Sequence, residues 1–417
     1  MRLGQVRGSA LAAAVGVAAV LGFQAVAGGS GGSGPDSHGA GGSGEAKAYG
    51  AGASVRRTGP AAGAMRTLAL KPTGDGGAAL ARRHTGLFGL LGVSWTDPAA
   101  QVEDTIQARA RSAETGEWSD WITLDPLPAG LDGRRPGAHG ATEPVWVGAS
   151  DGVEVRVSGG VLPAGLEVDL VEPGTPGTPG TPGSAGKKGG VNAGPAAFAT
   201  TTPHPGPVST APRPEVVSRA EWNADESLDN EAPAYLPGSR VKAVFVHHTA
   251  DAAPYDCSQS AAIVRGIHTY HVKTNGWRDL GYNFLVDKCG TIFEGRRGGI
   301  DQPVYGAHTY GWNSESTGIA VLGDYTSTGA SEAALESVAR IAAYKLGQYG
   351  GDLNATVTLV AGADQKNGFG TPFVAGRPYP FKAVSGHRDG FNTACPGHSL
   401  YAQLDLIRSS GPAARLA

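Results

Sequence analysis

The hydrophobic and polar positions divide the chain into two regions of different periodicity. Between residues 65 and 173, short runs alternate apolar and polar positions, as at Val153, Val155 and Val157 with charged residues between them. Gly, Pro and Asp separate these runs at roughly ten-residue intervals, a pattern typical of half-buried antiparallel strands. We therefore expect residues 65–173 to form an antiparallel β-sandwich that acts as an accessory domain.

From residue 213 to residue 417, continuous apolar runs alternate with amphipathic stretches. The runs at 241–249 and 318–325 predict buried strands. The other expected elements are a helix from an N-cap at Ser258 to a stop at Gly276, two strands around a turn at 288–290, a helix over 331–351, a strand over 381–387 and a final helix over 398–410. This alternation predicts an α/β domain, with a mixed β-sheet flanked by helices.

The first 27 residues have the pattern of an export signal. Arg2 and Arg7 precede the apolar run 10–20, and Ala25-Val26-Ala27 follows as a small-residue cleavage site. An uncleaved membrane anchor is the alternative, but the run is short and interrupted by Gly and Gln. We expect a secreted or cell-wall-associated protein with no stable membrane span after cleavage.

Two further segments read as linkers. Residues 28–64 are rich in Gly and Ser, and a PGT triplet that repeats three times from Pro173 begins the second segment, residues 174–212. Neither composition can bury enough apolar surface to order the chain by itself. The predicted organisation is therefore signal peptide, flexible linker, β domain, Pro/Gly-rich linker and C-terminal domain.

The composition of the chain limits the kinds of binding partner that we expect. The net charge is −3 and charged residues make up 17% of the chain, so no strong field favours nucleic acid or an anionic membrane surface. The β domain holds four of the seven Trp residues, for which core packing is the simpler interpretation and an aromatic sugar platform the alternative: Trp95, Trp118, Trp121 and Trp146. We expect no catalytic chemistry in this domain.

Candidate chemistry lies in the C-terminal domain, where two histidines and a cysteine follow predicted strands. His247 ends one strand, His387 ends another, and Cys395 lies in the loop after His387. Two His and one Cys leave the fourth position of a tetrahedral zinc free, as in catalytic zinc sites. The spacing of seven residues between His387 and Cys395 is not a standard metal spacing. A disulfide, a thiol nucleophile or three unrelated residues therefore remain open.

Four ordered motifs resemble the peptidoglycan recognition protein family, whose enzymatic members are zinc-dependent N-acetylmuramoyl-L-alanine amidases. They are "VFVHHTA", "GWRDLGYNFLVDKCGTIFEGR", "GAHTYGWNSESTGIAVLGDY" and "SGHRDGFNTACPGHSLY", and "SRAEWNADES" resembles the first segment of the family. The similarity covers about residues 214–408. It implies hydrolysis of the amide bond between the muramic acid lactyl group and L-Ala of peptidoglycan stem peptides.

The resemblance implies roles residue by residue. His247, His387 and Cys395 match the Zn²⁺ ligands of the family, and Tyr282 and Thr393 match its catalytic positions. Binding-only members typically lack the Cys ligand, whereas this chain keeps it. Tyr282 would donate a hydrogen bond to the oxyanion of the intermediate, and Thr393 would help to hold that oxygen.

The substrate contacts implied by the resemblance are Gly276, Trp277, Arg296, His308 and Asn313. Gly-Trp occurs in members that prefer diaminopimelate-type stems, and the Arg296 fork could bind the extra carboxylate of that residue. For Trp277 and His308, simple packing of loop ends is an equal alternative. The expected partner is peptidoglycan, and the resemblance favours stems of the diaminopimelate type.

With Cys395 assigned to zinc, the resemblance leaves Cys257 and Cys289, which we expect to form a disulfide in an exported protein. The remaining histidines have structural interpretations. His248 should point away from His247 and be hydrogen-bonded in the interior. His268 and His271 lie on the predicted helix, and His398 lies at a helix start. Asp389 could orient a ligand histidine or pair with the adjacent arginine.

Two rival functions remain. The domain could bind peptidoglycan without cleaving it, or Cys395 and His387 could form a thiol peptidase. A catalytic cysteine usually begins a helix, which lowers its pKa, whereas Pro396 and Gly397 follow Cys395 directly. The intact ligand set favours the zinc amidase over both.

Overall fold

The computed structural model describes residues 64–100, 102, 105–128, 131–132, 137–174, 206–228 and 231–410. The predicted signal peptide, the first linker up to residue 63 and most of the second linker lie outside these residues. None of the described helices is long and apolar enough to cross a membrane. Residues 206–212 of the predicted second linker pack on the C-terminal domain, where Ser209 Oγ donates to the Tyr344 carbonyl at 2.8 Å.

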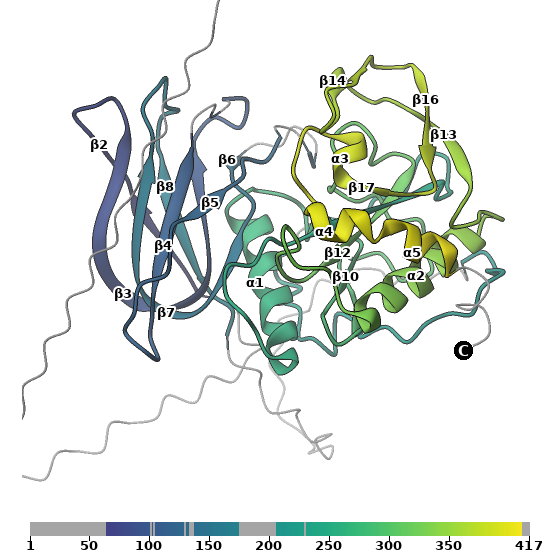
Figure 1. The fold of residues 1–417 in the computed structure, drawn as a ribbon, viewed down its shortest axis with the longest axis horizontal. Helices are drawn as coiled ribbons and strands as arrows, with labels where there is room; N and C mark the ends of the chain where they lie inside the picture. The colour runs from purple at the N-terminus through teal and green to yellow at the C-terminus, as the bar shows by residue number, and fades with distance from the viewer. Residues whose placement is uncertain are drawn as a thin grey trace, which may run out of the picture. The chain divides into compact units, whose positions relative to one another are not determined.

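The N-terminal domain is an antiparallel β structure, as expected. Its main strand order is β1-β8-β3-β7-β4-β5, with β2 and β6 paired to β3. The bounds are β1 Ala64–Ala69, β2 Lys71–Pro72, β3 Ala78–Trp95, β4 Ile106–Ser112, β5 Ile122–Leu124, β6 Gly140–Ala141, β7 Val145–Val157 and β8 Glu167–Glu172. The two longest strands, β3 and β7, bend around the core of the domain (Figure 1).

Alternation along the strands builds this core. Val153, Val155 and Val157 are buried, as their period-two spacing predicts. Register shifts between β3 and β7 mark bulges, which increase bending and let one sheet enclose its own apolar cluster. Of the four tryptophans, Trp95 and Trp146 are buried. Trp121 instead lies partly exposed, with the Arg156 guanidinium 4.0 Å from its ring centroid, so core packing explains only part of the set.

The C-terminal domain is an α/β structure around a five-stranded mixed sheet of order β11-β10-β12-β9-β17. The bounds are β9 Ala243–His248, β10 Phe284–Val286, β11 Ile292–Glu294, β12 Ser316–Val321 and β17 Val384–Gly386. Only the β10–β11 pair is antiparallel. The strand β9 is an interior strand between β12 and β17, which suits its unbroken apolar sequence.

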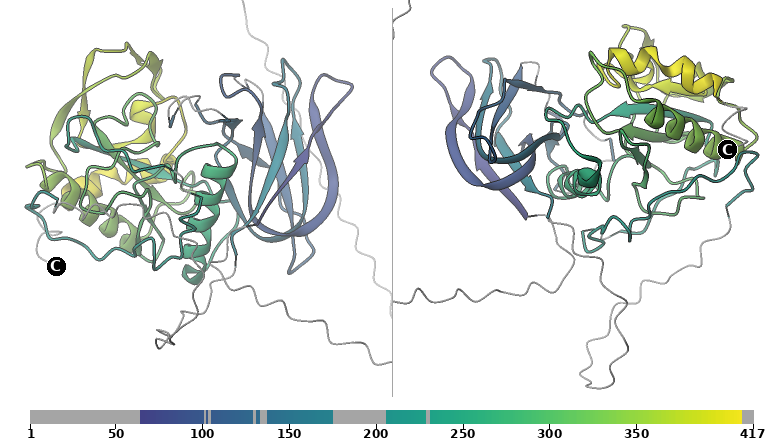
Figure 2. Two further views of the ribbon diagram at one scale, coloured as in Figure 1. Left: turned by 180° about the vertical axis from the view of Figure 1, so that it is seen from behind. Right: turned by 60° about the horizontal axis from the view of Figure 1, so that its bottom comes forward.

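Helices cover both faces of this sheet (Figures 1 and 2). On one face, α2 (Glu332–Gly347), α4 (His398–Ala402) and α5 (Leu404–Ser409) pack against Val244 and Val246. On the other face lies α1 (Ser260–Lys273). Since side chains alternate along β9, His247 points to the face opposite Val246, where the candidate site forms.

The structure corrects several expected boundaries. Ser258 does not cap the first helix: Asp256 accepts from the Ser258 amide at 2.9 Å and caps a short 3₁₀ turn, η1 (Cys257–Gln259), that leads into α1. The expected strand over 381–387 is two strands, β16 (Pro378–Lys382) and β17, and β17 lies at the edge of the five-stranded sheet. The expected final helix is divided at Gln403 into α4 and α5.

Four short elements have no counterpart in the sequence prediction: β13 (Thr356–Val360), β14 (Gln365–Lys366), β15 (Pro372–Phe373) and the part of β16 before residue 381. They pair as β13–β16 and β14–β15. One further short helix, α3 (His387–Gly390), follows β17 directly. It places His387 at the point where the strand ends.

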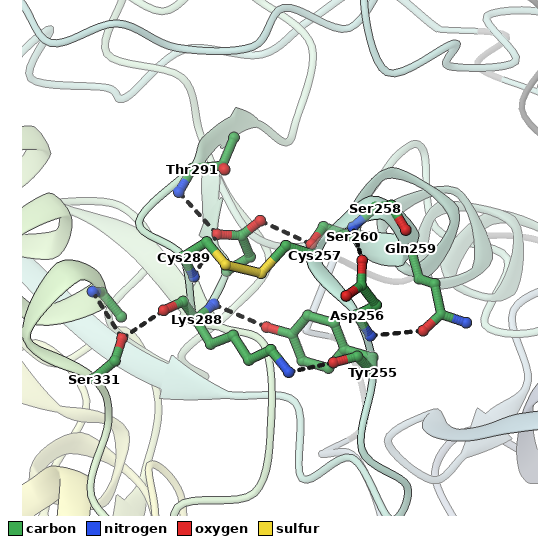
Figure 3. The surroundings of a disulfide bond; sticks show 12 residues. Tyr255, Asp256, Cys257, Ser258, Gln259, Ser260, Lys288, Cys289, Thr291 and Ser331 are labelled. Carbon is green, nitrogen blue, oxygen red and sulfur yellow. Dashed lines mark hydrogen bonds between the residues drawn. A yellow bond between two sulfur atoms is a disulfide. The ribbon is translucent and has the colours of Figure 1, made fainter.

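The expected disulfide is present between Cys257 and Cys289, which are 32 residues apart (Figure 3). It joins η1 to the turn between β10 and β11. Asp287 lies beside it and accepts from the Cys289 amide at 3.0 Å and from the Thr291 amide at 2.8 Å. The bridge and this carboxylate together fix the hairpin that follows Tyr282.

Removing this disulfide should destabilise the C-terminal domain. Closing a loop of this length restricts the unfolded chain, and the chain-entropy estimate for its loss is about 3–4 kcal/mol. We expect the double variant C257S/C289S to unfold at lower temperature and lower urea concentration than the wild type. Unchanged transitions by calorimetry and by urea titration would contradict this expectation.

Candidate metal centre and active site

Three candidate ligands converge where β9 and β17 end. His247 is fully buried near the end of β9, and His387 begins α3 directly after β17. Because the two strands are parallel neighbours, their carboxyl ends meet at the same edge of the sheet. The two imidazole rings lie 4.4 Å apart between centroids.

Cys395 reaches the same point from the loop after α3. Its Sγ lies 3.8 Å from His247 Nδ1, and one ligand atom of each of His247, His387 and Cys395 lies within 4.8 Å of the others. The Arg388 amide donates to the Cys395 carbonyl at 3.0 Å, which holds the loop against α3. The structure thus brings the three candidate ligands together, and their role as metal ligands stays a prediction.

The donor set fits a zinc ion. Two imidazoles and one thiolate are common zinc ligands, and three protein ligands leave one coordination position for water. Among the described residues, His387 Nε2 is buried without a hydrogen-bond partner. A buried nitrogen with no partner costs about 1–3 kcal/mol, a cost that a bound cation would offset.

The protonation states agree with this fit. Burial lowers the pKa of His387 to about 3, with a smaller effect of His248, and it lowers the pKa of His247 well below the usual value. Both imidazoles are therefore neutral, as metal ligands must be. Burial raises the pKa of the Cys395 thiol. A buried thiol that stays protonated is a poor nucleophile but becomes a thiolate when it binds a metal.

A second layer of contacts orients His247. Its Nε2 lies 3.2 Å from His308 Nδ1, and Thr309 Oγ1 lies 2.9 Å from the same His308 nitrogen. Asn313 Oδ1 accepts from the backbone amides of His308 and Thr309 at 3.0 and 2.9 Å. Contacts of this kind fix the ring of a metal-binding histidine. The structure thus places His308 and Asn313 behind a candidate ligand, in the buried interior.

Tyr282 lies beside the cluster, with its ring centroid 5.2 Å from that of His247. It precedes β10 and is buried. Thr393 lies two residues before Cys395, and its hydroxyl oxygen accepts from the Cys395 amide at 3.1 Å. A hydroxyl that accepts one hydrogen bond can still donate its proton, so Thr393 keeps a donor for a bound molecule.

The other predicted substrate contacts are buried against the β domain. Arg296 is 3% exposed and pairs with Asp132 Oδ1 at 2.9 Å, while it also donates to the Leu280 and Tyr305 carbonyls. Trp277 packs in a small apolar cluster with Leu127 and Leu131 of that domain. The Arg296 guanidinium, which was predicted to bind a substrate carboxylate, therefore already binds the Asp132 carboxylate of the same chain.

Gly276 follows α1 with a φ of +68°, and a side chain there would meet the backbone of Ala138 at 2.9 Å. Both the left-handed conformation and this close approach favour glycine. The position of Gly276 is thus explained by the backbone and by its contact with the β domain. Its role in substrate binding stays a prediction.

The remaining polar predictions resolve as follows. His248 is buried and its Nδ1 accepts from the Tyr325 amide at 3.3 Å, as expected for an interior residue. His268 Nε2 lies 3.2 Å from Asp279, and His271 Nδ1 accepts from the Gly281 amide. His398 is exposed at the start of α4.

Asp389 follows neither expected arrangement. It accepts from the Gly386 amide at 2.8 Å and from the Tyr401 hydroxyl at 2.6 Å. The carboxylate therefore caps α3 and ties it to α4, and it supports His387 only through the backbone.

A cavity of about 560 Å³ borders the ligand cluster. The C-terminal domain lines it with His387, Thr393 and Cys395, and the β domain lines it with Asp125 and Glu143. Sequence reasoning assigned no chemistry to the β domain and missed both carboxylates. Neither belongs to a motif, and only the contact between the two domains brings them here.

The comparisons with known families agree with this geometry. Residues 237–398 match the N-acetylmuramoyl-L-alanine amidase family, and residues 51–189 match the Rv3811 N-terminal galactose-binding domain-like family. The C-terminal domain therefore has the amidase-family pattern, and the β domain is galactose-binding-like.

Curated relatives bear names of both the amidase and the recognition type. Human N-acetylmuramoyl-L-alanine amidase is 33% identical over 198 residues, which are 47% of this chain and 28% of the human protein. The pig protein of the same name is 32% identical over 46% of this chain and 27% of its own length. Peptidoglycan-recognition protein SC2 of Drosophila simulans is 28% identical over 45% of this chain and 84% of its own.

The chain thus spans little more than a quarter of the first two relatives. Among solved structures, Drosophila peptidoglycan recognition protein SD is 24% identical, with 46% of this chain and 94% of that chain covered and a TM-score of 0.35. Peptidoglycan recognition protein LE in complex with tracheal cytotoxin is 25% identical, with 46% and 92% covered and a TM-score of 0.35. The family match and the curated relatives confirm the resemblance to peptidoglycan recognition proteins that the sequence motifs suggest.

Proposed function

We propose that this chain is a secreted, zinc-dependent N-acetylmuramoyl-L-alanine amidase. It hydrolyses the amide bond between the lactyl group of muramic acid and L-Ala of peptidoglycan stem peptides. The observation that carries the proposal is the cluster of His247, His387 and Cys395, with ligand atoms within 4.8 Å of one another, at the edge of a cavity. The amidase-family match over residues 237–398 supports it.

The ligand cluster would hold the zinc ion, which lowers the pKa of bound water to about 7 and polarises a carbonyl group. The neutral imidazoles of His247 and His387 supply lone pairs to it, and His308 holds the His247 ring in place. Tyr282 and Thr393 are the hydroxyl donors beside the cluster, and we assign them to the oxygen of the scissile carbonyl.

The proposed test uses purified sacculi with diaminopimelate-type stems. We expect the full chain to release peptides with a free L-Ala amine, detected by mass spectrometry. A chelator should stop this release, and added Zn²⁺ should restore it, because hydrolysis needs the metal.

The alternative function is binding without cleavage. Under that function, the chain sediments with sacculi and yields no free L-Ala amine at any zinc concentration. Such a result, with zinc bound at one ion per chain, would overturn the amidase proposal. A release that persists after chelation but stops after thiol alkylation would instead support a thiol peptidase.

A further inference from the structure

A carboxylate of the β domain reaches the candidate active site. Glu143 lies between β6 and β7, and both of its carboxylate oxygens accept from the Tyr282 hydroxyl at 3.3 Å. It lines the same cavity as His387 and Cys395. Because the cavity stays open beside Glu143, this side chain borders space for a bound molecule and does not fill it.

Glu143 is held in an unusual electrostatic state. Within the part of the chain that the structure describes, no Arg or Lys side chain pairs with it. Burial raises its pKa to about 7, the hydrogen bond from Tyr282 lowers it, and the charge of Asp125 raises it. A buried carboxyl group without a cation costs stability, which is typical of a functional position.

Asp132, a second carboxylate of the β domain, has a purely structural role in the contact with the C-terminal domain. Asp132 pairs with Arg296 at 2.9 Å and lies 3.5 Å from Arg278, and the Leu131 carbonyl accepts from Asn313. These bonds anchor the segment of the β domain that precedes Glu143. Asp132 therefore fixes the interface, whereas Glu143 faces the cavity.

We propose that Glu143, supplied by the β domain, is a catalytic proton-transfer residue of the amidase. The inference rests on the proposed function. Zinc hydrolases that cleave amides commonly combine the metal with a carboxylate base. Among the described residues that line the cavity, the only carboxylates are those of Asp125 and Glu143, and Glu143 is the one in contact with Tyr282.

The Glu143 carboxylate takes a proton from the attacking water. At the same time the water oxygen forms a bond to the lactyl carbonyl carbon, and the electron pair of the C=O bond moves to the carbonyl oxygen. The electron pair on the former carbonyl oxygen then re-forms the C=O bond as the C–N bond breaks, and Glu143 gives its proton to the L-Ala nitrogen, which keeps the electron pair of that C–N bond. Water and the amide yield a carboxylic acid and an amine, and Glu143 is again a carboxylate.

The test replaces Glu143 with Gln, which keeps the size of the side chain but cannot carry the proton. We expect kcat on sacculi to fall about 100-fold or more, with KM little changed. Zinc content and melting temperature should equal those of the wild type. The pH dependence of kcat should lose one ionisation; the titratable groups that face Glu143 are Tyr282, Asp125, Tyr270 and Cys395.

Two further variants keep the test specific. E143D retains the carboxyl group at a shorter reach, and we expect it to recover part of the activity lost in E143Q. E154Q is the matched control in the same domain, because Glu154 pairs with Arg82 and Arg109 away from the cavity. It should keep wild-type kcat.

Each outcome decides the inference. Wild-type or higher activity of E143Q would overturn it, and higher activity would show that the carboxylate obstructs the site. A loss that merely follows a lower melting temperature would also overturn it, since Glu143 would then be structural. If the wild type itself shows no zinc-dependent release, the proposed function and this inference fail together; if only E143Q is unaffected, the inference alone fails.

Discussion

Replacing Cys395 with alanine is expected to abolish release of stem peptides from sacculi. The substitution removes one of three candidate ligands and leaves His247 and His387, which cannot complete a catalytic zinc site by themselves. Zinc content measured by atomic absorption should fall well below one ion per chain. Binding of the variant to sacculi should persist, because the cavity beside the cluster keeps its other walls.

The matched variant is Cys395→Asp. A carboxylate oxygen is also a zinc ligand, so this variant should retain the metal and part of the activity. A thiol nucleophile predicts the reverse, because a carboxylate cannot replace the attacking sulfur. Full loss of activity in Cys395→Asp with zinc still bound would therefore contradict the ligand assignment.

Sequence alone predicted the elements that bury a continuous apolar face. The strand β9 and the helix α2 lie where their patterns place them, because burial on both faces or along one stripe leaves a clear signature. The hairpins β13–β16 and β14–β15 left no such signature. These strands are short and their residues are largely exposed. The strands therefore pair because of the surrounding loops, and not because of an apolar pattern of their own.

At the site, the candidate ligands could be predicted from the sequence, whereas the carboxylates of the β domain could not. The three candidate ligands lie at strand ends or in the following loop, where sequence position gives spatial position. Glu143 contacts Tyr282 across 139 residues, and Asp132 contacts Arg296 across 164 residues. These contacts depend on how the β domain packs on the C-terminal domain, and no periodicity within either domain encodes that packing.

The β domain covers part of the predicted substrate contacts. Arg296 and Trp277 were expected as substrate contacts, with loop packing as an equal alternative for Trp277, and both are buried against residues of the β domain. A stem-peptide carboxylate would have to compete with Asp132 for the Arg296 fork. Under the proposed function, stem-peptide binding would therefore involve residues of both domains.

The largest expected effect on stability comes from Asp279, which precedes Tyr282 by three residues. Its carboxylate is 3% exposed and lies 3.1 Å from the Arg219 guanidinium. It also accepts from the backbone amides of Leu280 and Arg297, each at 2.6 Å. Burial alone raises the pKa of Asp279, but Arg219 and His268 more than offset it, so the pKa is lowered overall.

Asp279→Ala would leave the buried Arg219 guanidinium without this partner and two amides without acceptors. Removing one member of a buried ion pair costs about 3–5 kcal/mol. We expect urea unfolding of the variant to show a loss of this size. Asp405→Ala is the control, because Asp405 is 89% exposed in its pair with Arg408 and should cost less than about 1 kcal/mol.

The effect of Asp279 should also depend on pH. A carboxyl group whose pKa is lower in the folded state stabilises the fold above its unfolded pKa of about 3.9, and this contribution is lost as the pH falls below that value. The difference in unfolding free energy between the wild type and Asp279→Asn should therefore be full at pH 7 and shrink below about pH 4. A difference that stays constant down to pH 3 would show that hydrogen-bond geometry, and not the charge of Asp279, stabilises the loop before Tyr282.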